Sequence, residues 1–433
     1  MKNIAIKQLI EKIEGEAELD FTFSNGQIED VKINFGFYRG IEDILKGKDA
    51  RDALVITPRV CGICNHAHLI ASLRAIEDGY KRARVEVNLS SKAKDIREFT
   101  LSCELIQNHI KWLYMTILPQ LESYIGQRSE ENYAIKASYL SSTITKALAI
   151  FAGQWPHSSY AVVGGVSCDP THLDVIQAQS LVEESIRFFE KVVTGMSFEE
   201  YLSIDSIKEL PKIQGDLGKL LYLIGSNDMA TIGKSHDRFI VFGESPIWVS
   251  AKSVGTLRSK VDTRYVKESI QKNTVAKAVE YKKRLYEVGS LSRGMVAKRP
   301  IIKSLHKRYK DSILTRIFAR VDEVSVLLNI CKNLLQNLVL EEPSCTLPLN
   351  KMVLNFEGVG IVEAARGSLI HKTKVKNGKI VNYEIITPTQ WNLSHGTKEE
   401  QGVAIKAMVG AKSIEEATFI FRTFDVCSVC TTQ

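Results

Sequence analysis

The sequence lacks a long apolar run, since no stretch reaches the roughly 18–20 apolar residues that a membrane-spanning helix needs. The first residues, MKNIAIKQLIEKIEG, are interrupted by Lys and Glu and contain no secretory apolar segment. We therefore expect a protein without a membrane span that is cytoplasmic and that meets a membrane only through a partner. Export, if it occurs, would also require a partner.

The sequence also has little clustered charge. The net charge is +7, but Lys and Arg are spread along the chain. The one dense basic run, residues 303–310, is typical of the solvated start of a helix, and we expect no nucleic-acid binding.

Linkers rich in Pro, Gly or Ser and internal repeats are absent, which favours a single domain over residues 1–433. Alternating residues around Asn25-Gly26 and Asn377-Gly378 predict hairpins at 17–35 and 370–386. The stretch 200–260 shows no clear period. Helical spacing of apolar residues predicts helices near 66–82, 90–126, 132–152, 171–194, 265–288 and 310–338. The expected fold class is α+β, with a central bundle of long helices and small peripheral sheets from both ends of the chain.

Eight cysteines in 433 residues are too few for a disulfide scaffold. Four are scattered, and we expect these to be small buried apolar residues: Cys103, Cys168, Cys331 and Cys345. The other four form two C-x-x-C pairs, Cys61 with Cys64 and Cys427 with Cys430. In a chain without an export signal, such pairs favour metal or redox chemistry.

Two residues between cysteines let both sulfurs of a pair face one ion, and two pairs make a site of four thiolates. Thiolates select zinc, iron in clusters or nickel. A structural zinc site usually joins pairs about 15–20 residues apart, whereas these pairs lie near opposite ends of the chain. The spacing favours a functional metal site, while structural zinc and separate redox pairs stay open.

The residues around the cysteines resemble two signatures of nickel–iron hydrogenase large subunits. These signatures are R-V-C-G-I-C-N-H-A-H at 59–68 and D-V-C-S-V-C at 425–430. Further elements of the family pattern follow in the expected order. They are I-E-G at 13–15, R-G-I-E at 39–42, W-P-H at 155–157 with V-G-G-V at 163–166, E-A-A-R-G at 363–367 and P-T-Q-W-N at 388–392.

The resemblance implies that all four cysteines bind nickel. Cys64 and Cys430 would also bridge to an iron that carries carbon monoxide and cyanide ligands, while Cys61 and Cys427 would bind nickel alone. Splitting dihydrogen needs a metal to accept electrons and a nearby base to accept a proton. A terminal thiolate, here that of Cys427, can act as such a base.

Other residue roles are also carried over by resemblance. Arg366 would lie above the metals, where a guanidinium stays charged and can polarise a substrate, and Asp425 would pair with it. Glu14 would relay protons outward. Taken without their context, these three are equally ordinary turn, cap or surface residues. His68 would lie behind the ligands and orient a thiolate.

The resemblance further implies a magnesium ion held by Glu42 and by the C-terminal residue, here Gln433. The family has histidine at that last position and proline where this chain has Val426, so the magnesium site departs from the pattern. Ala365 likewise replaces a proline beside Arg366. A canopy aspartate is not evident after Asn108-His109, and Ile63 is larger than the valine common at its position.

The implied function is reversible oxidation of dihydrogen to protons and electrons. Electrons would pass to an iron–sulfur small subunit, because this chain has no further cysteine constellation, and maturation proteins would insert the metals. The alternative is a hydrogen sensor with the same metals and low turnover that signals to a partner kinase. Gln433, Ile63 and a C-terminus without an extension lean towards sensing.

Overall fold

The computed structural model describes residues 5–10, 17–35, 38–127, 129–243, 255–257, 259–270, 277–347, 352–425 and 427. The strands are β1 (Ala5–Ile10), β2 (Ala17–Ser24), β3 (Gln27–Asn34), β4 (Ala161–Val162), β5 (Gly165–Val166), β6 (Ile240–Val241), β7 (Gly255–Thr256), β8 (Val266–Ile270), β9 (Lys277–Tyr281), β10 (Phe356–Ala364), β11 (Gly367–Lys376) and β12 (Lys379–Ile386). The helices are α1 (Ile41–Leu45), α2 (Ala53–Ile56), α3 (Asn65–Arg82), α4 (Ser91–Trp112), α5 (Leu118–Tyr124), α6 (Tyr133–Ala152), α7 (His172–Phe188), α8 (Phe198–Leu202), α9 (Gly215–Ser226), α10 (Ser290–Val296), α11 (Pro300–Tyr309), α12 (Ile313–Gln336), α13 (Pro388–Leu393), α14 (Val403–Met408) and α15 (Ile414–Arg422).

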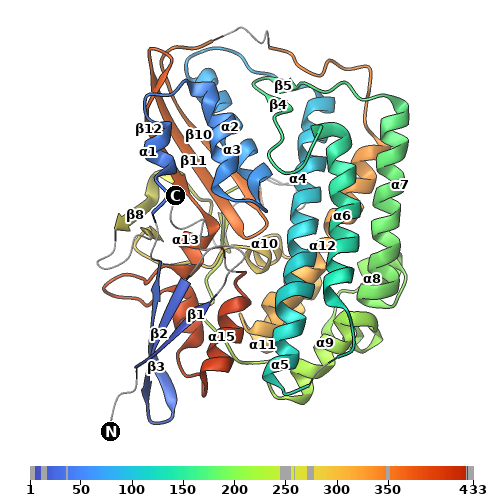
Figure 1. The fold of residues 1–433 in the computed structure, drawn as a ribbon, viewed down its shortest axis with the longest axis vertical. Coiled ribbons are helices and arrows are strands. Elements are labelled where there is room, and N and C mark those ends of the chain that lie inside the picture. Colours follow the sequence, from blue (N-terminus) through green and yellow to red (C-terminus); the bar gives the residue numbers. More distant parts are fainter. Residues whose placement is uncertain are drawn as a thin grey trace.

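A bundle of long helices forms one side of the molecule. Helix α4 packs against α6 and α12, and α7 packs against α6 and α12 (Figure 1). On the other side, α3 covers the antiparallel sheet β10-β11-β12, and a second antiparallel sheet, β1-β2-β3, lies below it (Figure 1). This arrangement confirms the α+β prediction. None of the helices in the described part of the chain is both long and apolar enough to cross a bilayer.

Both predicted hairpins are present, as β2–β3 and β11–β12, but each sheet has an outer strand that the sequence did not reveal, β1 and β10. The predicted helix at 265–288 is wrong, because the chain forms the antiparallel pair β8–β9 there. Val266 and Ile270 are four residues apart, a spacing that puts two side chains on one face of either a helix or a strand. The basic run at 303–310 covers the last seven residues of α11 and its C-cap residue, rather than a helix start.

Of the scattered cysteines, Cys103 and Cys331 are buried as expected, whereas Cys168 and Cys345 are partly exposed. Burial of the first two follows from their positions on α4 and α12, whose contact lies in the centre of the bundle.

The helices that border the site begin at defined caps. The Ser90 hydroxyl accepts a hydrogen bond from Ala93 N (3.0 Å) at the start of α4, and Ser312 does the same for Thr315 N (3.5 Å) at α12. Both helices present polar side chains to the interior, including Glu104 on α4 and Glu323 on α12. A buried polar face is unusual for a bundle and marks the side on which the site lies.

The backbones of helix α3 and strand β10 are in close contact, because β10 presents glycines to the helix. A Cβ on Gly360 would lie 1.9 Å from Ala71 O, and a Cβ on Gly358 would lie 2.0 Å from Ala75 O. Any side chain here would therefore push α3, the helix that follows Cys64, away from the sheet.

We expect Gly360→Ala to lower the melting temperature of the purified complex. Overpacking a tight contact usually costs about 1–3 kcal/mol, and the contacted atoms here are backbone that cannot rotate away. Gly225→Ala in α9 is the control, because its Cβ meets nothing within 4 Å and Ala favours a helix. Scanning calorimetry that gives equal melting temperatures for Gly360→Ala and the parent would contradict the close approach.

Candidate metal centre

The first cysteine pair is held at the start of α3. Cys61 follows a short 3-10 turn, Thr57–Val60, and Cys64 is the N-cap residue of α3. Arg39 fixes the approach to the pair, since its guanidinium donates to Val60 O (2.6 Å) and Arg59 O (2.9 Å). Both sulfurs are buried beside the positive end of the α3 dipole, an environment that favours thiolates.

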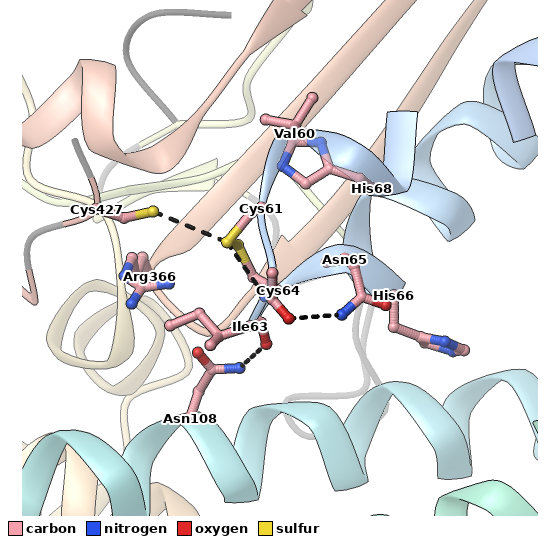
Figure 2. The surroundings of a disulfide bond; sticks show 12 residues. Val60, Cys61, Ile63, Cys64, Asn65, His66, His68, Asn108, Arg366 and Cys427 are labelled. Atoms are coloured by element: carbon pink, nitrogen blue, oxygen red, sulfur yellow. Dashed lines mark hydrogen bonds between the residues drawn. A yellow bond between two sulfur atoms is a disulfide. The ribbon is translucent and has the colours of Figure 1, made fainter. Parts of the chain in front are cut away.

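Cys427 comes from the other end of the chain and meets this pair. Its Sγ lies 3.8 Å from Sγ of Cys61, and the three sulfurs of Cys61, Cys64 and Cys427 all lie within 4.8 Å of one another (Figure 2). All three residues are buried, and they form the one group of potential metal ligands found among the described residues. Cys430, Glu14 and Gln433, the other predicted site residues near the termini, lie outside the described residues.

The separation of the Cys61 and Cys427 sulfurs fits two ligands of one soft metal ion. Metal–thiolate bonds of about 2.3 Å in tetrahedral geometry separate neighbouring sulfurs by roughly 3.8 Å. The Cys61–Cys427 distance, 3.8 Å, matches this separation. Cys61 and Cys64 are paired as a disulfide in this structure, and metal binding would use their thiolate forms.

Two arginines and an aspartate lie beside the sulfurs. Arg366, in the turn between β10 and β11, donates from Nε to Asp425 O (3.0 Å) and from Nη2 to Asp425 Oδ1 (3.2 Å). Arg320 of α12 makes a short ion pair with the same carboxylate. All three are buried, and two guanidinium groups against one carboxylate leave a positive charge near the thiolates. The pairing of Arg366 with Asp425 is therefore present.

A small cavity lies next to the Cys64 sulfur. It is lined by Cys64, His68, Arg366 and Thr389, among others. His68 Nδ1 lies 3.1 Å from Nε2 of His371, so this nitrogen contacts a histidine rather than a thiolate. Burial lowers the pKa of His68 to about 3, so the ring is neutral.

Helix α4 supplies residues that the sequence analysis missed. Gln107 and Asn108 each donate a hydrogen bond of 2.8 Å to Ile63 O, and Figure 2 shows Asn108 reaching the loop between the cysteines. Glu104 accepts from the backbone N–H groups of His66 (2.7 Å) and Ala67 (2.9 Å). Burial raises the pKa of Glu104 to about 7. The available signal was the helical spacing of these three polar residues, at positions i, i+3 and i+4.

The surroundings of Glu42 do not fit magnesium. Its two carboxylate oxygens accept hydrogen bonds from Lys277 Nζ at 2.9 and 2.8 Å, and Oε1 also accepts from Ile385 N at 2.7 Å. Magnesium needs oxygen ligands in an octahedron. Here the Lys277 ammonium already lies against both carboxylate oxygens, where the ion would have to bind.

The comparisons with known proteins point to one family. The nickel-dependent hydrogenase family matches residues 39–118 and 244–433. The chain is 24% identical to the periplasmic [NiFeSe] hydrogenase large subunit of Desulfomicrobium baculatum, over 92% of this chain and 88% of that one. It is also 24% identical to the sulfhydrogenase 1 subunit alpha of Pyrococcus furiosus, over 99% and 98%. The reduced Ni-Fe-Se hydrogenase structure from D. vulgaris Hildenborough superposes with a TM-score of 0.82 at 23% identity, covering 100% of both chains, and shows a shared fold.

The family match spans more than half of the sequence and includes the segments that carry Cys61, Cys64 and Cys427. The chain therefore belongs to the nickel-dependent hydrogenases, enzymes whose large subunits oxidise or produce dihydrogen at a nickel–iron site.

Proposed function

We propose that this chain is a catalytic large subunit that reversibly oxidises dihydrogen to protons and electrons. The observation that carries the proposal is the meeting of three buried cysteine sulfurs from opposite ends of the chain, beside a buried arginine. Cys61, Cys64 and Cys427 hold the metals, with Cys430 as the fourth ligand. Nickel, and iron with carbon monoxide and cyanide ligands, would supply the electron chemistry when bound.

The protein residues around the sulfurs have distinct roles in this proposal. Arg366 orients and polarises the substrate. Asp425 holds the Arg366 guanidinium in place through the contacts at 3.0 and 3.2 Å. The Cys427 sulfur accepts the proton. Before that step, the nearby positive charge of Arg320 and Arg366 keeps this sulfur in its thiolate form. Glu14 then relays the proton outward.

Electrons leave through a partner in this proposal. An iron–sulfur small subunit receives them, and maturation proteins insert the metals. The relatives support this, since they are named as a large subunit and a subunit alpha. We place the complex in the cytoplasm.

Hydrogen sensing is the second candidate, in which the same centre turns over slowly and signals to a kinase. The observation that favours it is Ile63, which lies beside the centre between Asn108 and Arg366 (Figure 2). In this candidate function, the added methylene of Ile63 relative to valine would narrow the route of gas to the metals.

Metal analysis and infrared spectroscopy of the purified complex test the proposal. We expect nickel in amounts equal to the chain, carbon monoxide and cyanide bands, and hydrogen-dependent reduction of a viologen dye. Zinc without these bands would contradict a nickel–iron centre. Nickel with the bands but a very low dye-reduction rate would favour the sensor over the enzyme.

A further inference from the structure

Glu42 lies at a junction of three chain segments. It belongs to α1, its Oε1 accepts from Ile385 N of β12, and both its oxygens accept from Lys277 of β9. The side chains of Glu42 and Lys277 are 12% and 22% exposed, so the pair is largely removed from water.

A second carboxylate approaches the same ammonium. Glu268 of β8 has Oε1 at 3.6 Å from Lys277 Nζ, and its side chain is 16% exposed. The register of β8–β9, with Glu268 opposite Val279 and Ile270 opposite Lys277, holds Glu268 and Lys277 near one another. One ammonium thus faces two carboxylates.

A divalent cation cannot share this place. Its carboxylate ligand would have to give up the hydrogen bonds at 2.8 and 2.9 Å, and the ion would lie next to a like-charged ammonium in a poorly hydrated site. Magnesium also retains several waters, for which a carboxylate already occupied by Lys277 and Ile385 leaves few positions.

We propose that the Lys277 ammonium is the resident cation at Glu42 and that the protein binds no divalent metal ion there. The ammonium performs the bridging task of such an ion, since it ties α1 to the β8–β9 pair while Ile385 N ties α1 to β12. Arg39, just before α1, donates to the carbonyls of Arg59 and Val60, immediately before Cys61. The lysine therefore supports the segment that presents the first cysteine pair.

The test measures magnesium in the purified complex and its melting temperature with EDTA and with millimolar MgCl₂. We expect far less than one magnesium per chain and a melting temperature that neither reagent changes. Magnesium bound in equal amount to the chain, with a fall in melting temperature after EDTA, would overturn the proposal.

Lys277→Met supplies the second arm. Without the ammonium, Glu42 and Glu268 lose the cation that both contact, so the melting temperature should fall by a few degrees and MgCl₂ should restore part of the loss. Lys277→Arg keeps the charge and should respond to neither reagent. Lys374→Met is the control, because Lys374 pairs with Glu357 (2.5 Å) on the neighbouring strand β10 and is more exposed than Lys277.

The outcomes of the variants are separable. A Lys277→Met protein with the parent's melting temperature and no magnesium response would overturn the bridging role. If Lys277→Met does not fold, the parent's magnesium content and the behaviour of Lys277→Arg still decide the question. The readouts are stability and metal content, so the result stands apart from any measurement of hydrogen turnover.

Discussion

Cys427→Ser is expected to reduce hydrogen-dependent dye reduction by more than about 100-fold, because even an outer residue that only orients a ligand is worth 10–100-fold at a metal site. Serine replaces a soft thiolate with a hard, mostly protonated hydroxyl, which nickel binds poorly at neutral pH. The nickel content of the complex should fall together with the rate. Dye reduction and metal analysis on the same preparation measure both.

Cys345→Ser is the matched control for this substitution. Its sulfur donates to Leu347 O at 3.2 Å, a contact that a hydroxyl can also make, and it lies outside the cysteine cluster. This variant should keep the parent's nickel content and rate. A Cys427→Ser complex with full nickel and full activity would remove Cys427 from the proposed ligands.

The sequence predicted the parts of the fold that are set by local pattern. The hairpin at β2–β3 follows from alternation around Asn25-Gly26, and α3 and α6 follow from long helical periodicity. It failed at β8–β9, where the spacing of Val266 and Ile270 suits both periods, and it missed β10. The polar–apolar alternation of β10 is weakened by Gly358 and Gly360. These positions require glycine because the backbone of α3 packs directly against them.

The cysteine cluster could be anticipated from resemblance, but its surroundings could not. Gln107 and Asn108 contact the loop between Cys61 and Cys64, and Glu104 contacts the first turn of α3, only because α4 crosses these segments in three dimensions. Lys277 was hidden for a related reason. Its partner Glu42 is 235 positions away in sequence, and the apolar spacing around Lys277 predicts a helix instead of a strand. Contacts of this kind depend on tertiary packing, for which one sequence carries no direct signal.

Behind the centre, a buried ion-pair network joins α10, α12 and β10. Arg293 donates to both oxygens of Glu323 (2.6 and 2.7 Å) and to Glu363 (3.1 Å). Glu323 also lies 2.9 Å from His109 Nε2. Burial opposes ionisation of Glu323, but the charge of Arg293 outweighs this and holds the pKa of Glu323 well below its usual range. Glu363, a member of this network, lies three residues before Arg366 in the chain. The network therefore also supports the turn that carries Arg366.

Arg293→Met should destabilise the complex by about 3–5 kcal/mol, the usual cost of removing one partner of a buried ion pair. Arg293 and Glu323 have side chains that are 0% exposed, so water cannot replace the lost charge. Without Arg293 the pKa of Glu323 rises above its unfolded value, and the loss of stability should therefore grow as pH rises through that pKa. Adding Glu323→Gln should recover part of the melting temperature and flatten this pH dependence, because no unpaired charge then remains at that position.

Arg264→Met is the control. It removes an ion pair whose arginine is 85% exposed, and scanning calorimetry should find its melting temperature unchanged. Equal melting temperatures for Arg293→Met and Arg264→Met would mean that the buried network contributes nothing to holding α10, α12 and β10 together.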